Sequence, residues 1–76
     1  MPSAPPPDWV LSRRRAVGAH IRSARIHADL TQEQVALTTG IDRPSIVRIE
    51  SGQQAPTLDS LIRIADAIGV PLRDLV

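Results

Sequence analysis

The sequence predicts an all-α protein, a compact bundle of four to five short helices, and two observations carry this prediction. Apolar residues recur at intervals of three, four and seven positions, the spacing that places side chains on one side of a helix. Four stretches also begin with a Thr or Asp suited to capping a helix N-terminus, and two of these end at a glycine suited to closing the helix. With 76 residues, of which 42% are hydrophobic, the chain is expected to form one small core.

Composition excludes several classes of protein. The chain has no cysteine, so a disulfide framework and a thiolate metal site are impossible, and a cytoplasmic protein is expected. No apolar run approaches the ~20 residues of a membrane span, and the proline-rich start lacks the apolar continuity of a secretory signal. An enzyme is not expected, because the sequence offers two distant histidines and no paired carboxylates. No cofactor, metal or small-molecule ligand is predicted.

Residues 1–7 hold four of the seven prolines and are expected to form a disordered or extended arm, with the folded domain spanning residues 8–76. An arm that contacts a DNA minor groove or a partner is the alternative, but the segment has no Lys or Arg to reach phosphates. A solvated leader is therefore the preferred interpretation.

The first helix is expected to be capped by Asp8 and to carry an apolar stripe. The stripe consists of Val10, Val17, Ile21, Ala24 and Ala28. Trp9, the only aromatic residue, is expected to seal the open end of the core, with an exposed partner contact as the alternative. His20 and His27 lie ~10 Å apart along the helix axis, too far to chelate one ion, and are expected to be solvated.

The middle of the chain predicts two short helices joined by a tight turn. Thr31 can cap the first of them, with Gln34 completing a capping box, and Gly40 can close it in the left-handed conformation. Asp42 can cap the second helix through the backbone amide of Ser45. The apolar residues that the two helices share at their contact are Val35, Ala36, Ile46 and Ile49.

The outer face of the second of these helices combines two arginines with two apolar side chains and no acid. Its residues are Arg43, Pro44, Val47 and Arg48. Arginine can present two donors to guanine O6 and N7, and an apolar group can touch a thymine methyl, so this face is a candidate for reading base edges. Backbone N–H groups at the start of the first of the two helices, together with the amide of Gln32 and with Thr31, form a candidate phosphate site. Further phosphate contacts are expected from polar residues nearby, namely Arg22, Ser45, Gln53 and Gln54.

A fourth helix is expected between its cap, Thr57, and Gly69. Its apolar stripe consists of Leu58, Leu61, Ile62, Ala65 and Ile68. Pro71 then begins a last short turn near the C-terminus.

The ordered set of these features resembles the Cro/repressor-type, or xenobiotic-response-element-type, helix-turn-helix regulators. The resemblance covers roughly residues 17–76 and is carried by LTQEQVA, Gly40, IDRPSIVRIESG and PTLDSLIRIADAIGV. It implies a lambda-repressor-like DNA-binding domain whose recognition helix, about residues 43–51, lies in the major groove of double-stranded DNA. One such domain reads few base pairs, so a homodimer on a near-palindromic operator is expected.

The resemblance also implies two sets of structural contacts. Arg25 matches a position that pairs with the residue here occupied by Glu50, so an ion pair is expected between them. Asp29 stands where the family often has glycine and must tolerate a left-handed turn. The surface where family members often meet a second copy contains Val70, Leu72 and Leu75, and the alternative for these three is that they cover the monomer core.

Several functional alternatives remain open at this point. The chain carries a net charge of only +1, with +4 on residues 1–28 and −3 on residues 29–76, so that a basic and an acidic face are expected. A protein-interaction module with the same fold is the main alternative to a DNA-binding regulator, although an acidic or strongly apolar outer face would suit it better. Among regulators, the controller proteins of restriction-modification systems and antitoxins are the subclasses considered.

Overall fold

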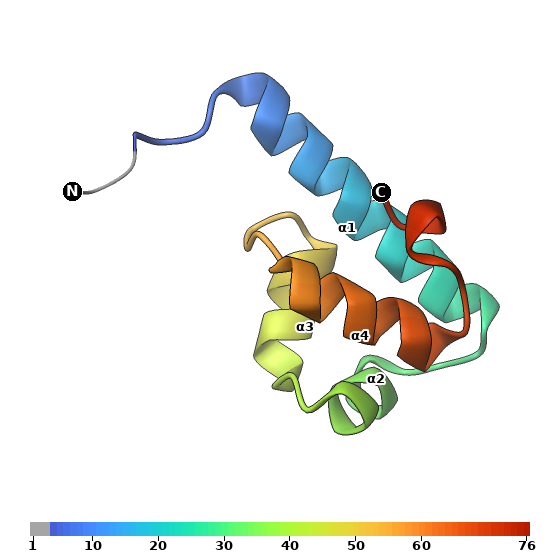
Figure 1. Cartoon of the computed structure of the whole chain (residues 1–76). Coiled ribbons are helices and arrows are strands. Elements are labelled where there is room, and N and C mark those ends of the chain that lie inside the picture. Colours follow the sequence, from blue (N-terminus) through green and yellow to red (C-terminus); the bar gives the residue numbers. More distant parts are fainter. Residues whose placement is uncertain (1–3) are drawn as a thin grey trace.

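The computed structural model describes residues 4–76, which form four α-helices and one short 3₁₀ helix (Figure 1). The elements are α1 (Asp8–His27), α2 (Gln32–Thr39), α3 (Arg43–Glu50), α4 (Leu58–Ile68) and the 3₁₀ helix η1 (Leu72–Asp74). Across residues 4–76 there is no β-strand, and no helix is long and apolar enough to cross a membrane. The all-α fold predicted from the sequence is therefore confirmed.

Four pairwise contacts arrange the α-helices around one core. α3 and α4 pack against α1, and α2 packs against both α3 and α4. Figure 1 shows α1 along one side of the molecule and the C-terminal segment returning to lie beside it. The pair α2 and α3, with the short turn between them, forms the predicted helix-turn-helix.

The caps predicted from the sequence define where the helices begin and end. Thr31 Oγ1 accepts from the backbone N–H of Gln34 at 3.0 Å, and Gln34 Oε1 accepts from the N–H of Thr31 at 2.8 Å, which completes the capping box of α2. Gly40 closes α2 with a φ of 76°. Asp42 and Thr57 cap α3 and α4, each by accepting the N–H three residues ahead. The turn before α3 is thus determined by local chemistry.

The start of α1 differs from the prediction in two respects. Asp8 is the first helical residue, and the capping position is Pro7, which makes no side-chain hydrogen bond. Trp9 is 71% exposed, so the prediction that it packs against the core is wrong. The physical reason is that the first turn of α1 extends beyond the other helices, where a side chain has little of the fold to pack against (Figure 1). Of the expected arm, residues 1–3 lie outside the described residues, and residues 4–7 are exposed coil.

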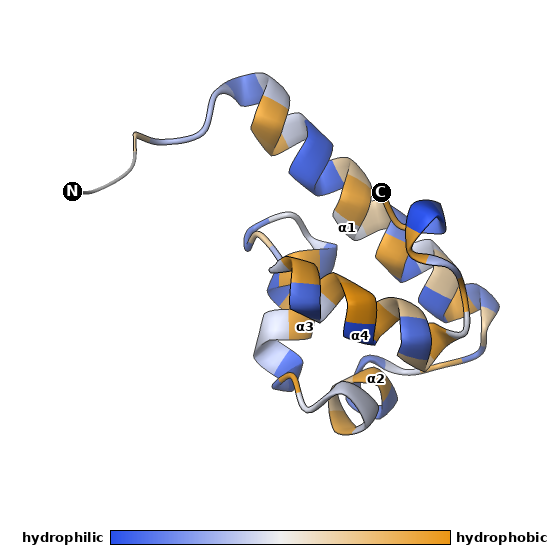
Figure 2. Ribbon diagram, viewed as in Figure 1, coloured by the Kyte–Doolittle hydropathy of each residue, from blue (hydrophilic) through white to orange (hydrophobic). Residues whose placement is uncertain are grey.

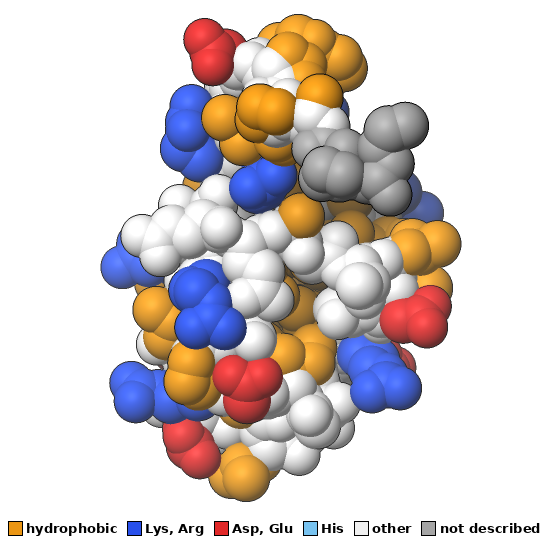
Figure 3. All heavy atoms as spheres, turned by 90° about the vertical axis from the view of Figure 1, so that its left-hand side faces the viewer, with side chains coloured by type: hydrophobic (Ala, Val, Ile, Leu, Met, Phe, Trp, Pro, Cys, Tyr) orange, Lys and Arg blue, Asp and Glu red, His pale blue; other side chains and the backbone are white. Residues whose placement is uncertain are grey.

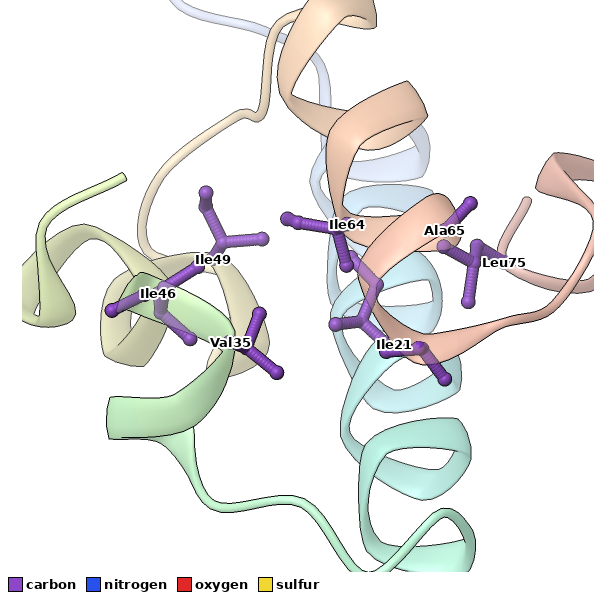
Figure 4. Packing of buried hydrophobic residues seen from close by; sticks show 9 residues of the cluster. Ile21, Val35, Ile46, Ile49, Ile64, Ala65 and Leu75 are labelled. Carbon is purple, nitrogen blue, oxygen red and sulfur yellow. The ribbon is translucent and has the colours of Figure 1, made fainter. Parts of the chain in front are cut away.

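The core draws on the four α-helices and on Leu75, which follows η1, and Figure 4 shows its side chains pointing toward one another. Its buried members are Ile21, Val35, Ala36, Ile46, Ile49, Ile64, Ala65, Ile68 and Leu75. The shared contact predicted between α2 and α3 is therefore confirmed. In Figure 2, hydrophobic residues alternate with hydrophilic ones along α1 and α4, as expected for helices that bury one side.

The inward face of α4 is rotated relative to the predicted stripe. Ile64, which the prediction left out, is fully buried, whereas Leu58 is 63% exposed and Ile62 is 50% exposed. Residues 61, 64, 65 and 68 form a helical face that is equally consistent with the spacing rule, and α1, α2 and η1 select it. Spacing alone could not distinguish between these adjacent faces.

Gly18 allows α1 and α3 to meet backbone to backbone. A Cβ atom at this position would lie 2.7 Å from the carbonyl oxygen of Glu50 and would also collide with the carbonyl oxygen of Ile49. Glycine is thus required here for close approach, within a regular helix. The crossing of these two helices sets the position of α3 relative to the rest of the molecule.

Candidate nucleic-acid interface

The structure brings together Arg25 and Glu50, the two residues expected to form an ion pair. Arg25 Nε donates to Glu50 Oε2 at 2.7 Å, and Arg25 Nη2 donates to Glu50 Oε1 at 2.9 Å. Both residues are buried, with exposed fractions of 9% and 7%. The paired, parallel hydrogen bonds are the strong geometry for a guanidinium and a carboxylate. This contact ties the end of α1 to the end of α3.

Two further hydrogen bonds extend the pair toward the start of α2. Arg25 Nη1 donates to the carbonyl oxygen of Leu30 at 2.8 Å, and Gln32 Nε2 donates to Glu50 Oε1 at 3.2 Å. The Glu50 hydrogen bond raises the pKa of Arg25 above its already high ordinary value, so the guanidinium stays charged at every working pH. The sequence did not predict the Gln32 contact, because nothing in the local pattern places an amide 18 residues before Glu50 beside it.

The outer face of α3 is exposed as predicted from helical spacing. Arg43, Pro44, Val47 and Arg48 are all exposed, whereas Ile46, Ile49 and Glu50 on the other side of α3 are buried. Figure 3 views the molecule from the side where α3 lies in Figure 1, and there the basic side chains stand apart from one another among polar, apolar and a few acidic ones. The basic side chains on this side of the molecule are thus dispersed rather than gathered in one dense patch.

A hollow at the start of α2 gathers several of the candidate phosphate residues. It is lined by Arg22, Arg25, Leu30, Thr31, Gln32, Glu33 and Arg43. Arg22 and Thr31 are exposed there, and Gln32 is half-buried because its amide reaches Glu50. Arg43, expected to read bases, thus also borders the site expected to bind phosphate. An anion in this hollow would meet the unpaired backbone N–H groups of the first turn of α2, the positive end of the helix dipole and two exposed guanidiniums, with the carboxylate of Glu33 opposing it.

Polar contacts along the outer side of α3 connect its cap to the loop that follows it. Ser45 Oγ donates to Asp42 Oδ1 at 2.8 Å, and Arg48 Nη2 donates to Ser45 Oγ at 3.3 Å. Arg48 Nε donates to Gln54 Oε1 at 2.9 Å. The hydroxyl and then the backbone N–H of Ser45 hold the pKa of the Asp42 carboxyl below its usual value, and the charge of Arg48 contributes further. Cap, helix and loop therefore share one hydrogen-bonded chain.

The structure places the remaining candidate residues in different surroundings. Gln53 is exposed in the loop after α3. Leu75 is fully buried in the monomer core, so it has no side-chain surface to offer a second copy, and the alternative interpretation holds for this residue. Val70 and Leu72 are half-buried and pack against the core while keeping part of their surface exposed. Leu75 is drawn inward because η1 folds its end onto α1 and α4; the carbonyl oxygen of Leu75 lies 3.3 Å from His20 Nδ1.

The family model described as Helix-turn-helix matches residues 21–75, most of the described chain. The matched segment includes α2 and α3, the buried Arg25–Glu50 pair and the outer face of α3.

Curated relatives of similar sequence are named as transcriptional regulators. The chain is 38% identical over 56 residues to "Cryptic phage CTXphi transcriptional repressor RstR" of Vibrio cholerae, which covers 74% of this chain and 50% of that protein. This chain therefore aligns with about half the length of that repressor. It is 32% identical over 66 residues to "Uncharacterized HTH-type transcriptional regulator y4dJ" of Sinorhizobium fredii, which covers 87% of this chain and 86% of that protein.

Two solved structures share the fold. The restriction-modification controller protein C.AhdI from Aeromonas hydrophila superimposes with a TM-score of 0.83 at 28% identity, covering 86% of this chain and 98% of that one. The hypothetical transcription factor NHTF from Neisseria superimposes with a TM-score of 0.76 at 28% identity, covering 99% of this chain and 84% of that one. The fold and the placement of its helices are thus shared with proteins described as regulators.

Proposed function

The chain belongs to the Cro/repressor-type helix-turn-helix family of DNA-binding transcriptional regulators, and from that premise we propose that it acts as a homodimer on a near-palindromic operator. In this proposal residues 8–76 form the DNA-binding domain, α3 lies in the major groove and the protein works in the cytoplasm. The relatives named as a repressor and as a controller protein favour a small regulator of this kind over an antitoxin or a protein-interaction module.

One observation carries the proposal. The outer face of α3 presents Arg43 and Arg48 to solvent, while the only acid of that helix, Glu50, is buried against Arg25. α3 therefore offers two guanidiniums to a polyanion, and the neighbouring carboxylate of the Asp42 cap is engaged by the backbone N–H and hydroxyl of Ser45. The buried pair also fixes the helix, so this face is presented in one orientation.

The proposed DNA contacts are of two kinds: contacts to phosphates position the protein on the duplex, and contacts to base edges specify the sequence. Arg22, Thr31, Gln32 and Gln53 are proposed to contact phosphates and set the register. Ser45, also expected at a phosphate, has both its hydroxyl and its backbone N–H engaged by Asp42 and has no donor left for this role. Arg43, Pro44, Val47 and Arg48 are proposed to contact base edges, with guanine and thymine methyl groups as their partners. Gln32 keeps part of this role, because an amide nitrogen carries two donors and only one is needed for Glu50.

A dimer is proposed because one recognition helix can contact only a few base pairs. Two copies of α3 would enter successive major grooves with half-sites ~34 Å apart. We propose that the exposed parts of Val70 and Leu72 contribute to the contact between copies, since both follow α4 and keep part of their apolar surface exposed. Leu75 supports that surface from inside the core.

Selection of bound sequences from a random duplex pool at two salt concentrations tests this function. The expected result is a near-palindromic motif containing G·C pairs, with half-sites about one helical turn apart and weaker binding at higher salt. Failure to enrich any motif, with binding that is equal on all sequences, would contradict sequence-specific regulation. A motif with a single half-site would contradict the dimer.

Two variants separate base reading from phosphate contact. Arg48→Ala is expected to reduce discrimination at one base pair of each half-site by about 1 to 3 kcal/mol, because a bidentate arginine–guanine contact is lost. Arg43→Ala is expected to do the same at a second base pair. The measurement is the dissociation constant on the selected operator and on its single-base variants, with Arg63→Ala on the exposed side of α4 as the control. If a variant instead lost the same affinity on every sequence, and the slope of log affinity against log salt concentration became shallower by about one, the affected arginine would be assigned to a phosphate contact.

A further inference from the structure

Gln54 lies beyond the end of α3 but contacts its outer face. Its Oε1 accepts a hydrogen bond from Nε of Arg48 at 2.9 Å, while Ser45 Oγ accepts from Nη2 of the same guanidinium at 3.3 Å. The edge of the guanidinium formed by Nε and Nη2 is therefore occupied by two neutral acceptors of the protein itself. The side chain of Arg48 is held on both sides before any DNA arrives.

The loop that carries Gln54 is anchored to the residue that it contacts. Gly52 has a φ of 79°, a left-handed conformation that favours glycine and turns the chain back toward α3. The backbone N–H groups of Gln53 and Gln54 both donate to the carbonyl oxygen of Arg48, at 2.8 and 3.2 Å. The hydroxyl of Ser51 donates to the same oxygen at 3.1 Å. The backbone of Gln54 is thus fixed relative to Arg48.

The second acceptor, Ser45, is oriented as well. Its hydroxyl donates to Asp42 Oδ1 at 2.8 Å, which leaves the lone pairs of its oxygen to accept from Arg48. Asp42 is held in turn because it also accepts the backbone N–H of Ser45 as the cap of α3. Arg48 therefore sits between a helix cap and a loop that are each anchored by backbone hydrogen bonds.

Resting on the proposed DNA-reading function, we propose that Gln54 is a positioning residue that aims Arg48 end-on at a guanine. A guanidinium has five N–H donors in one plane. Gln54 and Ser45 engage the Nε donor and one donor of Nη2, which leaves both donors of Nη1 and the second donor of Nη2 for DNA. One donor from each of the two terminal nitrogens matches the O6 and N7 acceptors of guanine. Ordering the side chain in advance also reduces the entropy that it loses on binding.

The test measures how strongly the full chain prefers guanine at the base pair read by Arg48, as a ratio of dissociation constants on the selected operator and its single-base variants. Gln54→Ala is expected to lower this ratio about 2- to 10-fold, the effect of one hydrogen bond, at that base pair only. Gln54→Glu keeps an acceptor oxygen for Arg48 and is expected to keep the ratio, while its added charge weakens binding to all operators alike. Gln53→Ala, at the neighbouring position, is expected to weaken all operators equally and leave the ratio unchanged.

Two results would overturn the proposal on the DNA side. In the Arg48→Ala background, Gln54→Ala is expected to have no further effect on base preference, because the two residues act as one unit. A separate effect there would mean that Gln54 reads DNA itself. If Gln54→Glu lowered the preference for guanine as much as Gln54→Ala does, the effect would depend on the amide donors of Gln54 and not on its acceptor oxygen.

A measurement without DNA keeps this inference separate from the proposed function. In the free protein, the Nε–H resonance of Arg48 in nuclear magnetic resonance is expected to exchange slowly with solvent in the native chain and in Gln54→Glu, and quickly in Gln54→Ala. Equal exchange in the native chain and Gln54→Ala would overturn the positioning role. If the proposed function were wrong, the protein would select no DNA sequence, although the Nε–H of Arg48 would still exchange slowly with solvent.

Discussion

Glu50→Ala is expected to lower the free energy of unfolding by about 3 to 5 kcal/mol, a large part of the stability of a small domain. The change leaves the buried guanidinium of Arg25 without a counter-charge and removes the acceptors for its Nε and Nη2 donors. It also removes the acceptor of Gln32, so the links from α1 and from the start of α2 to α3 fail together. Urea unfolding followed by circular dichroism measures the effect.

Two further variants make the result interpretable. Glu33→Ala removes an exposed acid on α2 and is expected to change stability by less than about 0.5 kcal/mol. The double variant Arg25→Met with Glu50→Leu removes both charges and fills the space with apolar atoms, and it is expected to recover much of the loss. If Glu50→Ala were no more destabilising than Glu33→Ala, the pair would contribute nothing that the rest of the packing does not already supply.

Gly18→Ala is expected to destabilise the protein by about 3 kcal/mol or more, although alanine normally stabilises a helix relative to glycine by about 1 kcal/mol. The sign reverses because the added methyl group would meet backbone carbonyls of α3, which cannot rotate away as a side chain can. Relief requires α1 and α3 to separate, and that movement displaces Ile49 from the core and strains the Arg25–Glu50 pair. Thermal and urea unfolding measure the stability.

The adjacent variant Ala19→Gly calibrates the helix-propensity term. Ala19 is exposed on the same helix, so its replacement is expected to cost only about 1 kcal/mol. Gly18→Ala is also expected to weaken operator binding at temperatures where the variant is still folded, because the displaced α3 no longer matches the anchored start of α2. A variant that is as stable as the native chain would show that the two helices do not approach as closely as described.

The caps of α2, α3 and α4 show how much of the fold could be predicted from the sequence. Thr31 with Gln34, Asp42 with Ser45, and Thr57 with Ser60 all form the hydrogen bonds expected from residues three positions apart. Such bonds depend on the backbone of one turn and on no other part of the chain. The same holds for the outer face of α3, since helical periodicity separates it from buried Ile46 and Ile49 once the helix is placed.

Local sequence patterns predicted only part of the candidate site. The Arg25–Glu50 contact was expected from the family resemblance and not from spacing, because 25 residues of chain separate the two side chains. The contacts of Gln32 with Glu50 and of Gln54 with Arg48 were missed, since each depends on how a loop or helix end is folded back onto α3. No sequence pattern around a glutamine in a polar segment indicates which residue its side chain will contact.

By itself the sequence determined the helices, the capped starts of α2, α3 and α4 and the two faces of α3, because capping bonds and helical periodicity act within one or two turns. Only the tertiary structure decided that Trp9 is exposed and Leu75 buried, that α4 turns Ile64 inward, and that Gly18 lies at the closest approach of α1 and α3. Burial depends on what lies opposite a side chain, and in a core drawn from four α-helices and the C-terminal Leu75 the opposite surface comes from distant parts of the chain.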